Sequence, residues 1–160
     1  MIEEDAQTGE GLRAAFDVHY AALMRLCLAL GDQHGDAEDV VQEAFARAAP
    51  SLEGLKPEVV RAYLRRTVLN LRTDRARTTA RSGDPLPPRE IPDPMNAIDD
   101  REVLWAALGE LPDRQRACLV LRFFEDLPER EVASLLGCSV GSVKSHTHRG
   151  LKRLRKDIER

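Results

Sequence analysis

The C-terminal part of the chain holds side chains of the types that contact nucleic acid. Apolar or small residues recur every three or four positions after residue 139, which predicts the packing stripe of an α-helix: Val140, Val143, Thr147, Leu151, Leu154 and Ile158. At about 100° per residue, a hydroxyl and several cations fall on the opposite face: Ser145, Arg149, Lys152 and Lys156. Such groups hydrogen-bond base edges and phosphates. The pattern therefore predicts a helix that enters a DNA groove.

The residues just before this helix indicate how it is positioned. Pro128 suits a first helical turn, and Ala133 is small where a second helix can cross closely. Gly137 can take the left-handed conformation that ends a helix, and Ser139 is a good N-cap for the next one. A helix, a four-residue turn and a helix with a basic outer face form a helix-turn-helix pattern. The alternative is an ordinary helical hairpin with a solvated cationic face, which explains these turn residues less well.

A second cluster of cations lies near the middle of the chain. Residues 61–81 contain seven Arg against one Asp, and like charges at this density repel one another. Apolar residues at helical spacing predict a helix over residues 58–80, with a stripe of Val60, Leu64, Thr67 or Val68, and Leu71. The helix also carries Tyr63 and Asn70, so it can hold phosphates and hydrogen-bond a base. We favour this interpretation over a solvated helix whose Arg stems cover the core.

An acidic helix precedes the Arg-rich one. Asp36 is expected to be its N-cap, and Pro50 is expected to end it. Its inward face is predicted to consist of Val40, Val41, Ala44, Phe45 and Ala48. The pattern alone favours a solvated acidic face for the remaining side chains, among them Asp39, Gln42 and Glu43.

Proline content divides the chain into two helical modules. Residues 82–97 contain five of the nine prolines, which excludes a helix and predicts a semi-stiff linker. The expected fold is therefore all-α, with two small helical domains over residues 10–81 and 98–160 and a Pro-rich linker between them.

The terminal parts of these modules follow the same helical spacing. Residues 1–10 are expected to fray, and a helix is predicted from residue 11 to residue 30. Near the second module's centre, we expect Phe123 and Phe124 to pack inward, and Trp105 to cover the small core.

The charge distribution matters more than the net charge of −3. Residues 61–81 carry a net +6 and residues 144–160 a net +5, whereas residues 1–60 carry −8 and residues 82–143 carry −6. Local fields decide whether a polyanion binds. Two compact basic blocks in an acidic protein are thus compatible with nucleic-acid binding.

Several functional classes find no support in the sequence. There is no apolar run of bilayer length and no N-terminal signal pattern, so we expect no membrane insertion and a cytoplasmic location. Cys27, Cys118 and Cys138 are far apart and are expected to be reduced thiols. His146 and His148 would lie about 160° apart on a helix and cannot share a metal. With no phosphate loop or nucleophile elbow, we expect no enzymatic activity, no cofactor and no metal.

Taken together, the two modules resemble an extracytoplasmic-function (ECF) sigma factor of the sigma-70 family. DAEDVVQEAF resembles the family's helix that docks on the clamp of core RNA polymerase, and AYLRRTVLNLRTDRAR resembles the segment that opens and reads the minus-ten element. The stretch from ALGELPDRQR to RGLKRLRK resembles the domain that binds the minus-thirty-five element. Within it, SVGSVKSHTHRGLKRLR is most like a SigE-type actinobacterial subgroup. The family usually has Ser or Thr where Pro128 stands, and often Arg or an apolar residue at His146 and His148.

The resemblance implies three sets of site residues. The contacts implied for the minus-thirty-five element are Ser142, Lys144, Ser145, His148, Arg149, Lys152 and Arg153. Those implied for the minus-ten element are Arg61, Arg65, Arg66, Asn70, Asp74, Arg75 and Arg77. Those implied for docking on the polymerase are Asp39, Gln42 and Glu43.

The implied partners are core RNA polymerase and promoter DNA, duplex at minus-thirty-five and melted at minus-ten. An anti-sigma factor is a further partner that could cover apolar residues exposed when the modules separate. The alternative function is a free-standing helix-turn-helix regulator that binds duplex operator DNA. The N-terminal module argues against it, because an acidic docking helix and an Arg-rich helix have no role in such a protein.

Overall fold

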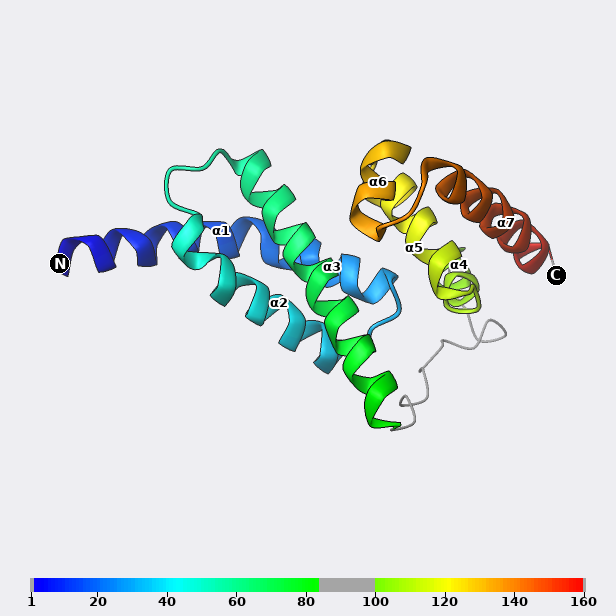
Figure 1. Ribbon diagram of the computed structural model, residues 1–160, viewed down its shortest axis with the longest axis horizontal. Coiled ribbons are helices and arrows are strands. Elements are labelled where there is room, and N and C mark those ends of the chain that lie inside the picture. Colours follow the sequence, from blue (N-terminus) through cyan, green and yellow to red (C-terminus); the bar gives the residue numbers. More distant parts are fainter. Residues whose placement is uncertain (1, 84–99, 160) are drawn as a thin grey trace. The chain divides into compact units, whose positions relative to one another are not determined.

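The computed structural model describes residues 2–83 and 100–159, which form two compact units (Figure 1). Within these residues the secondary structure is helical and contains no strand, which confirms the all-α expectation. Most of the predicted linker, residues 82–97, lies outside the described residues. The predicted domain boundaries stay a prediction. Each unit is described by itself below.

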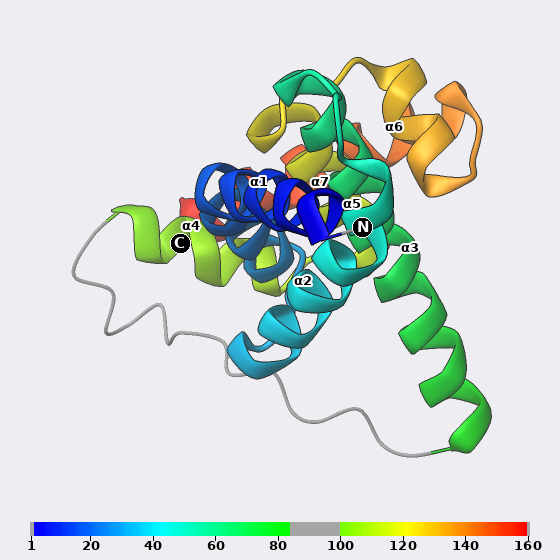
Figure 2. The ribbon, with the colours of Figure 1, turned by 90° about the vertical axis from the view of Figure 1, so that its left-hand side faces the viewer.

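Three helices and one 3-10 turn make up the first unit. They are α1 (Ile2–Ala29), α2 (His34–Ala48), η1 (Ala49–Ser51) and α3 (Pro57–Ser82). The residues of α1 up to Leu28 belong to this unit. α2 and α3 run side by side, and the view turned by 90° shows α1 nearly end-on beside them (Figure 2).

The core of the first unit is built where the predicted stripes meet. All five predicted inward residues of α2 are buried, and so are Val60, Leu64, Val68 and Leu71 of α3. Val68 takes the core position, while the Thr67 hydroxyl donates to the Tyr63 carbonyl at 2.9 Å. Phe16 of α1 joins this core through Phe45, with ring centroids 5.0 Å apart.

Helix ends in the first unit differ from the expectations in three places. α1 begins at Ile2 instead of near residue 11, because Gly9 and Gly11 weaken a helix by only about 1 kcal/mol each and do not end it. Gln33, not Asp36, is the N-cap of α2: its backbone is extended and its carbonyl accepts from Ala37 N at 2.9 Å. α3 continues to Ser82 and ends at Gly83, whose φ of 69° is left-handed.

The second unit groups the short segment Ala29–Asp32 with the C-terminal helices. These are α4 (Asp100–Gly109), α5 (Asp113–Leu119), the π-helical turn η3 (Val120–Phe124), α6 (Glu129–Leu136) and α7 (Val140–Ile158). α4, α5 and α6 all pack against α7. Ala107, Leu111, Leu119 and Leu154 form a small buried cluster between them.

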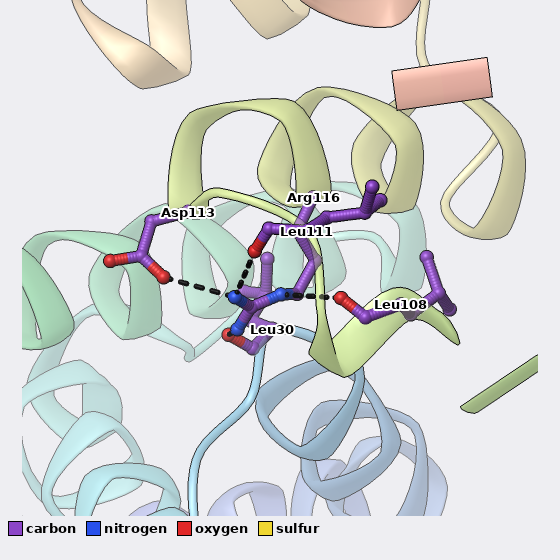
Figure 3. Close-up of polar contacts among 5 residues, drawn as sticks. All are labelled: Leu30, Leu108, Leu111, Asp113 and Arg116. Atoms are coloured by element: carbon purple, nitrogen blue, oxygen red, sulfur yellow. Dashed lines mark hydrogen bonds and ion pairs between the residues drawn. The ribbon is translucent and has the colours of Figure 1, made fainter. Parts of the chain in front are cut away.

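A buried arginine holds the start of α5. The Arg116 side chain is 1% exposed, and a buried guanidinium is costly unless its donors are satisfied. Figure 3 shows it donating to three carbonyl oxygens, those of Leu108 (2.9 Å), Leu111 (2.7 Å) and Leu30 (3.0 Å), and to Asp113 Oδ1 (3.1 Å). Arg116 is therefore a structural cation of the second unit.

The packing stripe of α7 is narrower than predicted. Val143, Gly150 and Leu154 are buried, but Val140, Leu151 and Ile158 are 38%, 42% and 50% exposed. Gly150 accounts for the difference. A Cβ atom there would lie 2.9 Å from Leu119 Cδ1, so α7 crosses α5 closely at the glycine.

The expectation that Phe123 and Phe124 pack inward was wrong. They are 60% and 46% exposed. Their segment is the π-helical turn η3, in which an extra residue per turn rotates the following side chains away from the face that an α-helix would bury. Phe124 still meets Trp105 edge-on, with ring centroids 6.4 Å apart.

Candidate nucleic-acid interface

The turn between α6 and α7 has the geometry that its sequence predicts. Gly137 is left-handed with φ 63°, and the N–H of Cys138 donates to the Ala133 carbonyl at 3.0 Å. Ser139 caps α7, because its Oγ accepts from Ser142 N at 3.0 Å. The short α6 thus ends at Leu136, and three residues separate it from the start of α7.

One face of α7 presents the predicted polar residues. Six of them are exposed, namely Lys144, Ser145, His148, Arg149, Lys152 and Arg153. At about 100° per residue they spread over half of the helix, opposite the buried Val143, Gly150 and Leu154. Ser142 is half-buried and shares the cap with Ser139. Lys144 Nζ lies 3.8 Å from Glu129 Oε2 at the start of α6.

The Arg-rich helix α3 presents a second polar face. Arg66, Asn70, Asp74 and Arg77 are exposed and fall within about 80° of one another around the helix. Hydroxyl groups beside this face satisfy backbone carbonyls of the same helix, for example Thr73 to Leu69 at 2.9 Å. Four of the seven residues implied for the minus-ten element therefore share one accessible strip.

The other three candidates on α3 lie elsewhere. Arg65 is only 7% exposed, because its position on the helix falls between the core stripe and the buried Leu69. Arg61 is exposed on the side of α3 that faces His19, and its charge together with burial lowers the pKa of that histidine, burial being the larger cause. Arg75 turns toward α2 and donates to Glu43 Oε2 at 3.1 Å.

The implied docking residues share the outer face of α2. Asp39 and Gln42 are exposed, and Glu43 is half-buried. Glu43 is engaged by two arginines, Arg47 at 2.6 Å and Arg75 at 3.1 Å. These lower the pKa of its carboxyl group, chiefly through the hydrogen bond from Arg75. Glu43 consequently links α2 to α3 as well as facing solvent.

Sequence reasoning did not identify several residues that position the α7 face. Gly150 sets the crossing of α7 on α5, and Arg114 and Arg122 of the α5–η3 segment donate to carbonyls that flank α6. A glycine within the helical pattern of residues 140–158 was the available signal for Gly150. For the arginines the sequence holds no signal, since an arginine at such a position reads as a surface residue.

Metal and membrane sites receive no support in the part of the chain that the structure describes. Among those residues no group of three or more His, Cys, Asp or Glu side chains is arranged to hold a metal ion. Cys118 is a buried thiol whose pKa is raised to about 11 by burial, with smaller effects from Cys138 and Arg114. A search of the described helices finds none with the length and apolarity that a bilayer crossing requires.

Comparison with known proteins matches both units to one family. The model for sigma-70 region 2 matches residues 15–82, and the model for sigma-70 region 4 matches residues 101–154. The RNA polymerase sigma-E factor of Streptomyces antibioticus is 38% identical over 142 residues, covering 86% of this chain and 79% of that protein. The ECF RNA polymerase sigma factor SigL of Mycobacterium tuberculosis is 32% identical over 159 residues, covering 92% and 89%.

Two solved structures share the fold. The sigma factor RpoE in complex with the anti-sigma factor NepR from Bartonella quintana matches with a TM-score of 0.72 at 22% identity, covering 92% of this chain and 96% of that one. CnrH in complex with the cytosolic domain of CnrY matches with a TM-score of 0.61 at 25% identity, covering 96% of both chains.

Proposed function

Because this chain belongs to the sigma-70 family and is an ECF sigma factor, we propose which of its surfaces carry out each step of initiation. As a sigma factor it binds core RNA polymerase and directs promoter-specific transcription initiation. The family consists of initiation factors and not of enzymes. The match of the first unit to region 2 disfavours the alternative of a free-standing helix-turn-helix regulator.

The polar face of α7 is proposed to read the minus-thirty-five element. Lys144, Ser145 and Arg149 are exposed beside the capped start of the helix and have the donors that guanine edges and phosphates accept. Lys152 and Arg153 lie farther along and are assigned to the DNA backbone. The supporting observation is that α7 buries one side and leaves these side chains together on the other.

The polar strip of α3 is proposed to hold the melted minus-ten strand. Arg66 and Arg77 would contact phosphates, and Asn70 between them would hydrogen-bond a base turned out of the stack. All three are exposed on one face. Arg65 is omitted from this proposal because it is buried, and Arg75 can contribute only by leaving or sharing Glu43.

The outer face of α2 is proposed to dock on the polymerase clamp. Asp39 and Gln42 are exposed opposite the buried side of α2, and a carboxylate there suits a basic partner surface. Since core polymerase acts in the cytoplasm, we place the chain there as well. An anti-sigma factor is a further proposed partner, by analogy with the solved complex of RpoE with the anti-sigma factor NepR.

Run-off transcription tests this proposal. The full chain is mixed with core polymerase and a promoter library randomised at both elements, and enriched promoters are sequenced. We expect core binding and enrichment of a two-part promoter. Failure to bind core polymerase at low salt would refute the proposal. Tight binding of duplex DNA by the chain alone would restore the free-standing regulator.

A further inference from the structure

An arginine of α5 holds the turn of the helix-turn-helix from outside. Arg114 Nη1 donates to the carbonyl oxygen of Leu136 at 2.8 Å, and Leu136 is the last residue of α6. The end of a helix leaves its last carbonyls without intrahelical partners. The N–H groups of Gly137 and Cys138 both donate to the Ala133 carbonyl. Neither reaches Leu136, so the guanidinium supplies a donor at this point of the turn.

The opposite end of α6 is held in the same way. Arg122 Nη1 donates to the carbonyl of Leu127 at 2.7 Å, immediately before Pro128, which is the N-cap of α6. Two arginines of the continuous α5–η3 segment therefore reach both ends of the eight-residue α6. α7 begins at Val140, so the contact at Leu136 lies close to the start of α7.

We infer that Arg114 is a positioning residue for promoter recognition: it fixes the α6–α7 turn so that the polar face of α7 enters the groove in one register. The inference rests on the proposed minus-thirty-five role of α7. A cation also suits the negative end of the α6 dipole. Because Arg114 is exposed, water can replace it at Leu136. The fold therefore survives its loss while the turn gains freedom.

The experiment uses holoenzyme reconstituted from the full chain and core polymerase. For each variant, the affinity for a promoter with the minus-thirty-five element selected by the wild type is compared with that for a scrambled element. Both affinities are measured over a range of salt concentrations. Arg114→Ala removes the contact, and Arg114→Lys keeps the charge near the helix end. Arg130→Ala is the matched control, because it removes an exposed arginine of α6.

Arg114→Ala is expected to lower the cognate-to-scrambled ratio about three- to fivefold, with an unchanged salt dependence. Arg114→Lys should keep most of the ratio, and Arg130→Ala all of it. The inference would be overturned if the slope of log affinity against log salt concentration fell by about one while the cognate-to-scrambled ratio stayed unchanged. That result would indicate a direct contact of Arg114 with a phosphate. An unchanged ratio with a lower unfolding temperature would overturn it in favour of a purely structural role. If the wild type itself ignored the minus-thirty-five sequence, the proposed role of α7 would fail as well, which is a distinguishable result.

Discussion

Individual side chains on α7 are expected to differ in what they contribute to recognition. Arg149 is exposed within a face of cations, and a guanidinium that makes two bonds to a guanine is a common source of base discrimination. Arg149→Ala should weaken binding to the selected minus-thirty-five element by about 1–3 kcal/mol, measured by competition with holoenzyme. Lys152→Ala is the comparison, expected to weaken all sequences alike. An unchanged sequence preference in Arg149→Ala would reassign Arg149 to phosphate.

The buried His19 is expected to make the stability of the first unit depend on pH. It is 7% exposed, and burial, followed by the charge of Arg61, lowers its pKa. The unfolded chain, with a histidine pKa of about 6.5, therefore binds the proton more readily than the folded chain. The contribution of neutral His19 to the free energy of unfolding is therefore fully present above about pH 6.5 and is lost progressively as the pH falls below that value. Urea unfolding of His19→Gln at pH 7.5 and 5.5 should show less loss than the wild type. Equal losses would contradict the assignment.

At the scale of the elements, the crossing of α7 on α5 depends on Gly150. A Cβ atom there would approach Leu119 Cδ1 to 2.9 Å and Cγ to 3.2 Å, and Leu119 is itself buried. Gly150→Val should therefore destabilise the second unit by about 2–3 kcal/mol. The fluorescence of Trp105, the single tryptophan, monitors unfolding of this unit.

Gly141 offers a control on the same helix. A Cβ atom there meets nothing closer than Ser139 Oγ at 3.8 Å, so Gly141→Ala should be neutral or stabilise by about 0.5 kcal/mol through helix propensity. A destabilisation of the same size in both glycine variants would show that the effect does not come from the crossing of α7 on α5, because helix propensity alone favours both Ala and Val over Gly.

Helical periodicity predicts which elements form but not how closely they approach one another. The stripes of α2 and α3 were correct because a long amphipathic pattern leaves little choice of buried face. The stripe predicted for α7 was wrong at Leu151, because α7 packs on α5 through Gly150, which has no side chain, and Leu151 is left 42% exposed. The prediction for Phe123 was wrong because a π-helical turn changes which side chains face the core, and no residue type in the segment indicates such a turn. The roles of Arg65 and Arg116 depend on tertiary burial and on distant carbonyls, which no local pattern contains.

At the scale of the whole molecule, we expect the charge distribution to separate docking on the polymerase from DNA recognition. Residues 1–60 carry a net charge of −8, and Asp39 is exposed within them on α2, outside both basic helices. Asp39→Lys should weaken core binding about ten- to a hundredfold, mainly through slower association, as measured by surface-based binding kinetics. Asp17→Lys makes the same change on the exposed face of α1 and should leave core binding near the wild-type value.

Docking and DNA recognition are separate functions only if a docking variant keeps its promoter choice once enough core polymerase is added to saturate it. At a core concentration high enough to saturate Asp39→Lys, we expect this variant to transcribe the selected promoter with the wild-type preference, because neither α3 nor α7 has changed. Arg149→Ala should show the reverse, with normal core binding and altered promoter choice. A different outcome would be an altered promoter preference of Asp39→Lys even in saturated holoenzyme. In that case the Glu43–Arg75 contact between α2 and α3 would have to transmit the effect of docking to the polar strip of α3. The two functions could then not be assigned to separate surfaces.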